Sequence, residues 1–116
     1  MIRFLRTVVL IASTIVGDAA VARPDVDSAI FIMPGCRAFL AETRPSRVDQ
    51  WKQILCSSVV GAIAYAGSRI CSPPDESNAQ TVRVVVKYID ERPQRHHESF
   101  KKLALEALQA NFPCKN

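Results

Sequence analysis

The sequence predicts an all-α protein, a small four-helix domain that consists of two helical hairpins, each closed by a disulfide. Three observations support this fold class. Apolar residues recur at helical spacing in four separate stretches. Serines with the spacing of N-terminal caps precede two of these stretches. Four cysteines follow an N-terminal segment with the features of an export signal, and an even cysteine count in a short exported chain indicates disulfides.

The first 22 residues have the layout of a secretory signal peptide. Arg3 and Arg6 precede an uncharged apolar run over residues 7–17, and Ala20-Val21-Ala22 offers a cleavage site of the small-x-small type. A membrane anchor is disfavoured, because the run is about half of the length that a spanning helix needs. We therefore expect a signal peptide over residues 1–22 and a mature helical domain over residues 23–116, with no membrane contact after cleavage.

A single domain is expected at a length of 116 residues, because a second one would be too small to bury its own core. The net charge is +4 for the whole chain, and +3 once cleavage removes Arg3, Arg6 and Asp18. No block of like charge appears, which disfavours a dedicated nucleic-acid binder. The mature chain has a small core, so disulfides would supply much of its stability.

The first helix is expected within residues 27–40. Its apolar face comprises Ile32, Cys36, Phe39 and Leu40. Pro34-Gly35 should either kink this helix or begin a shorter one, and Thr43-Arg44-Pro45 should end it.

The second helix is expected to begin after Ser46, which with Asp49 has the spacing of a capping box. Gly67 is the expected C-cap. Gly61 lies in the middle, where glycine weakens a helix, so we expect another helix to approach closely there. The apolar stripe comprises Val48, Trp51, Leu55, Val59, Ala62, Ala66 and Ile70.

The second hairpin is expected to turn near Pro93. Ser77 and Gln80 match a capping box, and this decides residues 82–89 in favour of helix, although their valines favour a strand by propensity. Pro93 is expected as the first residue of the last helix. The apolar face of that helix comprises Phe100, Leu103, Ala104, Ala107, Leu108 and Phe112.

The four cysteines allow three pairings, and the hairpins select one of them. Residues at equal distance from the turn lie side by side in antiparallel helices. Cys36 and Cys56 are each 10 residues from Ser46, whereas Cys71 is 22 residues before Pro93 and Cys114 is 21 after it. This predicts Cys36–Cys56 and Cys71–Cys114. A zinc site is disfavoured because no CxxC pair exists.

No arrangement of residues in the sequence indicates catalysis. His96 and His97 are adjacent and would point about 100° apart on a helix, so with Glu98 they make only a weak metal site. We therefore expect a binding protein without enzymatic activity, metal or cofactor. The candidate binding surface is the charged turn of the second hairpin, although an ordinary solvated turn is the alternative. The turn comprises Asp90, Glu91, Arg92, Pro93, Gln94, Arg95, His96 and His97.

Several stretches resemble the Rap/Tai family of type VI secretion immunity proteins. The first are MPGCRAFL over residues 33–40 and CSSVVGAI over residues 56–63. The most specific is QTVRVVVKYID over residues 80–90, which continues through Pro93, His97 and Phe100 to the Phe-Pro-Cys of residues 112–114. Two departures are Ser58, where the family commonly has Gly, and Ser-Pro-Pro after Cys71.

The resemblance implies a periplasmic, all-helical immunity protein without catalysis of its own. Such proteins bind and occlude a secreted peptidoglycan amidase effector, often as homodimers, and a late turn enters the cleft of the effector. By position this turn is residues 90–97 here. The main alternatives are a small periplasmic chaperone of the acid-stress type and an envelope binding protein without a cognate effector. A third is a minor enzyme or metal binder that uses His96 and His97.

Overall fold

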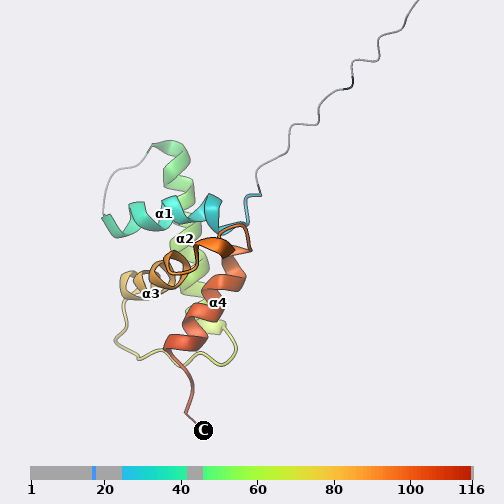
Figure 1. Cartoon of the computed structure of the whole chain (residues 1–116). Coiled ribbons are helices and arrows are strands. Elements are labelled where there is room, and N and C mark those ends of the chain that lie inside the picture. Colours follow the sequence, from blue (N-terminus) through green and yellow to red (C-terminus); the bar gives the residue numbers. More distant parts are fainter. Residues whose placement is uncertain (1–16, 18–24, 42–45, 116) are drawn as a thin grey trace, which may run out of the picture.

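The computed structural model describes Gly17, residues 25–41 and residues 46–115, and these ranges confirm the all-α class (Figure 1). Their elements are α1 (Ala29–Ala41), α2 (Arg47–Ala66), α3 (Asn78–Asp90), the short 3-10 helix η1 (Pro93–Arg95) and α4 (Phe100–Asn111). The predicted signal peptide, Gly17 apart, and the predicted helix stop at residues 43–45 lie outside the described residues. No helix in the described ranges is both long and apolar enough to cross a membrane.

The chain forms the two predicted hairpins and both predicted disulfides. α1 packs on α2, and α3 packs on α4. Cys36–Cys56 joins α1 to α2 with its two Cα atoms 5.3 Å apart, and both residues are buried. Cys71–Cys114 joins the loop before α3 to the segment after α4, with a Cα–Cα distance of 4.9 Å, and it is exposed.

All four helices contribute to one apolar core. The buried face of α2 differs from the stripe that the sequence suggested, because Trp51, Ala62 and Ala66 are exposed. Instead, Cys56 and Val60 point inward. The buried apolar residues are Ala29, Ile32, Met33, Cys36, Cys56, Val60, Val82, Val85, Ile89, Phe100, Leu103, Ala104, Ala107 and Leu108.

The backbone of a neighbouring helix approaches closely at Gly35 and not, as expected, at Gly61. α1 continues through Pro34, so no shorter helix begins there. A Cβ atom on Gly35 would overlap the carbonyl group of Lys52 in α2. A Cβ atom on Gly61 would meet only a side chain, with the Oδ1 atom of Asn78 at 3.2 Å.

The predicted capping residues begin both α2 and α3. The Ser77 hydroxyl accepts from the backbone N–H of Gln80, and the Gln80 side chain accepts from the Ser77 N–H, which completes a capping box. Residues 82–89 are therefore helical, as predicted, and belong to α3, which this capping box begins. Ser46 likewise accepts from the Asp49 N–H, but the shorter Asp49 side chain bonds to the Ser46 hydroxyl instead of its N–H.

The last helix begins at Phe100, seven residues later than the sequence suggested, and Pro93 begins η1 instead. The physical reason is a set of backbone hydrogen bonds to the start of α1. The N–H groups of Ala29 and Ile30 donate to the carbonyls of Glu98 and His96, at 3.0 and 2.9 Å. The carbonyls between η1 and α4 therefore satisfy N–H groups that the first turn of α1 leaves without a partner.

Candidate functional site

The predicted turn, residues 90–97, connects the end of α3 to the start of α4 and contains η1. It lies beside the start of α1 (Figure 1). Its sequence carries charges of both signs, and the structure separates them into two groups. One group makes hydrogen bonds and ion pairs within the protein, and the other is exposed.

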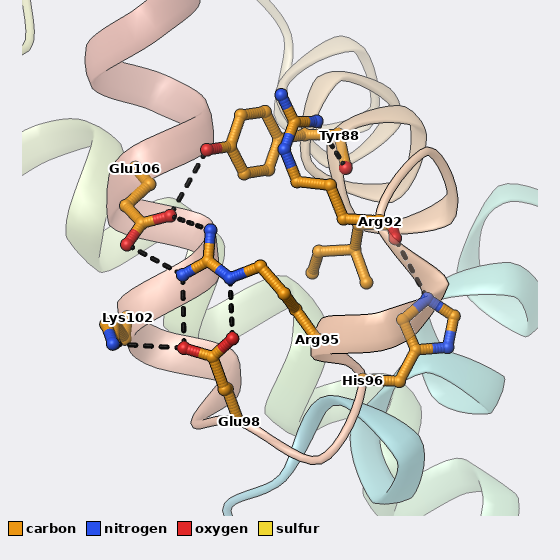
Figure 2. A network of polar contacts seen from close by, with 8 residues as sticks. Tyr88, Arg92, Arg95, His96, Glu98, Lys102 and Glu106 are labelled. Carbon is orange, nitrogen blue, oxygen red and sulfur yellow. Dashed lines mark hydrogen bonds and ion pairs between the residues drawn. The ribbon is translucent and has the colours of Figure 1, made fainter.

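Arg95 is the centre of the first group (Figure 2). Its guanidinium makes paired hydrogen bonds to Glu106, with Nη1–Oε2 at 2.7 Å and Nη2–Oε1 at 3.0 Å. It makes a second pair to Glu98. Lys102 donates to Glu98 at 3.0 Å, and the Tyr88 hydroxyl donates to Glu106 at 3.1 Å. We call these five residues the Arg95 network; it connects the turn to both α3 and α4.

Arg92 and His96 also face the protein. The Arg92 guanidinium lies over the Tyr88 ring, 3.6 Å from the ring centroid, and donates to the Tyr88 carbonyl at 2.8 Å. A ring nitrogen of His96, Nε2, lies 2.9 Å from the carbonyl oxygen of Ile89 (Figure 2). Both side chains therefore hold the turn against the last residues of α3.

Asp90 connects the turn to the first hairpin. Its carboxylate receives two hydrogen bonds from Arg37 of α1, at 2.7 and 2.8 Å. The hydrogen bonds from Arg37 lower the pKa of Asp90, and they raise the pKa of Arg37 in return. A paired geometry of this kind fixes the direction of both side chains as well as their distance.

The second group of turn residues points into solvent. Glu91, Pro93, Gln94 and His97 are all exposed. Of these, Glu91 has an ion partner in the described part of the chain, Arg92, at 3.8 Å. We call these four residues the outward set. They are the part of the predicted site that a partner can reach without disturbing the turn.

Arg95 lowers the pKa of both carboxyl groups that it contacts. Hydrogen bonds from Arg95, and then from Lys102, lower the pKa of Glu98 from 4.5 to about 2. Hydrogen bonds from Arg95 also lower the pKa of Glu106, with a smaller contribution from Tyr88. The same bonds raise the pKa of Arg95. Arg95, Glu98 and Glu106 therefore keep their charges at any pH near neutral.

The stability that these carboxylates contribute should be lost in acid. Their pKa values are lower in the folded chain than the ordinary 4.5, so the unfolded chain binds more protons as the pH falls below that value. The contribution is complete well above pH 4.5 and disappears as the pH falls through the folded pKa, about 2 for Glu98. Urea denaturation should show the free energy of unfolding falling over this interval.

A double variant, Glu98→Gln with Glu106→Gln, should have a shallower dependence of unfolding free energy on pH. Glu76→Gln is the matched control, because Glu76 lies in the loop at the opposite end of α3. Equal pH slopes for the double variant and the wild type would show that the Arg95 network does not contribute to acid sensitivity.

Sequence reasoning located the turn but missed the side chains that hold it. The spacing of Arg95, Glu98 and Lys102, at intervals of three and four residues, was a usable signal for ion pairs. Arg37 gave no such signal, because it lies 53 residues before Asp90. Tyr88 and Glu106 come together only through the packing of α3 on α4.

The two histidines of the turn have different surroundings. His96 already bonds to a carbonyl, and its neighbour His97 faces solvent. Among the residues that the structure describes, no three His, Cys, Asp or Glu side chains converge on a site that could hold a metal ion. The turn is held by its own hydrogen bonds and presents a few exposed polar groups.

Comparison with known families gives one match. A family model described as Rap1a immunity proteins matches residues 33–114, a range that contains both disulfides and the whole turn. Searches of curated proteins and of solved structures found no significant match.

Proposed function

Because the chain belongs to the Rap1a immunity protein family, we propose that it protects the cell that makes it from a peptidoglycan amidase injected by a type VI secretion system. The family assignment implies immunity to a secreted effector through binding rather than catalysis. The sequence resemblance to the Rap/Tai family supports an amidase as the effector and type VI secretion as its route into the cell. In this account the protein binds the effector and closes its catalytic cleft.

The observation that carries the mechanism is the division of the turn into held and exposed residues. Arg92, Arg95 and His96 hold the turn against α3 and α4, while Pro93 and Gln94 are exposed to solvent. A segment that is already ordered loses little conformational entropy when it binds. A held turn of this kind is suited to enter a cleft and block it.

The proposed compartment is the periplasm. The layout of residues 1–22 supports export, and the two disulfides fit an oxidising compartment. Peptidoglycan lies in the same compartment, so an antidote against a peptidoglycan-cleaving enzyme must be there too.

Deletion of the gene should make cells sensitive to their own parental strain in coculture. Survival of the deletion strain should be restored by the wild-type gene but not by a gene that lacks residues 2–22, because the shortened protein would stay in the cytoplasm. Recipient survival is counted with an attacker that has a working secretion system and, as a control, with one that has none.

Two results would contradict the proposal. Equal survival of the deletion strain and the wild type under attack would remove the immunity role. Suppression of aggregation of many unrelated proteins at acid pH, without any protection in coculture, would favour the chaperone alternative.

A further inference from the structure

A second surface lies beside the turn, at the start of α1. It is a hollow of about 440 Å³, which six residues line. His97, a member of the outward set, forms one wall, and Lys52 of α2 forms another. The remaining lining residues are Asp25, Ser28, Ile30 and Phe31.

The rim of this hollow exposes large apolar side chains. Ile30 is 63% exposed, and Trp51, at the start of α2, is 50% exposed. Phe31 connects them, because its ring meets the Trp51 ring edge to face with the centroids 6.2 Å apart. The Lys52 ammonium lies over the Phe31 ring, 4.4 Å from its centroid. Exposed aromatic and aliphatic side chains gathered at a hollow are typical of interaction surfaces.

Backbone hydrogen bonds join this surface to the turn. The Ile30 N–H donates to the His96 carbonyl, and the Phe100 N–H donates to the Asp27 carbonyl at 2.7 Å. These bonds hold the start of α1 beside residues 96–100. The outward set and the apolar hollow adjoin at His97, which belongs to both.

We propose that the hollow is a second contact for the same effector, filled by an apolar side chain of the effector that lies next to a carboxylate. This proposal rests on the proposed function. The shared residue His97 favours the effector as the occupant, because a protein that contacts His97 in the turn lies at the edge of the hollow. Lys52 supplies the positive charge that the carboxylate would meet, and Asp25, which carries the opposite charge in the same lining, would have to lie away from that carboxylate.

The two parts of the surface would have different roles. The polar outward set closes the catalytic cleft, whereas the hollow supplies affinity and selects one effector over others. Apolar anchors in the centre of an interface contribute most of the binding energy in known complexes.

The test varies the amount of protein that the recipient makes while it is attacked by the parental strain. Trp51→Ala and Ile30→Ser each remove an exposed side chain, so neither should unfold the protein, and thermal melts check this. At a typical loss for an interface anchor, the amount needed for half-maximal protection should rise about thirtyfold. Tyr65→Ala is the matched control, an aromatic on the same helix that is 95% exposed and far from the hollow.

The outcomes separate the two proposals. If Trp51→Ala and Ile30→Ser protect at the same level as the wild type and Tyr65→Ala, the hollow is not a contact, although the proposed function stands. If the wild type itself fails to protect, the proposed function and the contact both fail. Lys52→Glu should also raise the amount of protein needed for half-maximal protection, while Lys52→Arg should not. If Lys52→Glu protects as well as the wild type, the effector does not place a carboxylate at Lys52.

Discussion

Replacement of Gly35 by alanine should lower the free energy of unfolding by about 2 kcal/mol. The added Cβ would overlap the Lys52 carbonyl group and lie 2.6 Å from the backbone nitrogen of Gln53. Backbone atoms cannot rotate away as a side chain can, so α1 and α2 would have to separate. Overpacking of this kind costs up to about 3 kcal/mol, and the better helix propensity of alanine returns up to about 1 kcal/mol.

Gly61→Ala is the control for this prediction, because it makes the same change in the middle of the next helix. Its Cβ would meet the Asn78 side chain, which can shift. Urea denaturation should place this variant within about 1 kcal/mol of the wild type. If both variants are equally stable, close backbone contact at Gly35 does not limit the packing of the first hairpin.

Arg95→Ala should abolish much of the protection while the helices persist. The substitution removes four hydrogen bonds to Glu98 and Glu106, so the turn loses its paired hydrogen bonds to Glu106 of α4. In the variant, several side chains of the turn become ordered only when the effector binds. Ordering costs about 1 kcal/mol of binding free energy for each side chain, so the affinity for the effector should fall about tenfold or more. Arg95→Lys should not restore it, since an ammonium cannot bond two carboxylates in paired geometry.

The measurement is again the amount of protein needed for half-maximal survival under attack. Arg83→Ala is the matched control, because Arg83 is an exposed arginine on α3, one to two turns before Tyr88. Circular dichroism checks that the helical content is unchanged. Full protection by a folded Arg95→Ala variant would show that a held turn is not needed for immunity.

The hairpins and disulfides followed from the sequence, whereas the buried face of α2 did not. Residues that are equally many positions from the turn of a hairpin lie side by side. This rule predicts both disulfides, Cys36–Cys56 and Cys71–Cys114. α2 is apolar around much of its circumference, with Trp51 and Ile54 exposed beside the buried Cys56. Which face is buried then depends on where α3 and α4 pack, and a helical repeat alone does not show this.

The turn was also predictable in position but not in the role of each residue. Pro93 favours the start of a helix, yet α4 begins only at Phe100, because the carbonyls of residues 96 and 98 accept hydrogen bonds from α1. Arg95 and Gln94 are neighbouring polar residues in the sequence, but one is held by two carboxylates and the other faces solvent. Such contacts between separate helices decide which charges a partner can meet.

If the turn enters the catalytic cleft of an effector, the exposed Gln94 should lie inside that cleft. A photo-crosslinking amino acid at position 94, in recipient cells under attack, measures this, with position 65 as the control site. We expect position 94, but not position 65, to form an adduct with a peptidoglycan-cleaving enzyme at its catalytic cleft. A protein that still protects the cell while position 94 gives no adduct, or an adduct outside the cleft, would contradict the account.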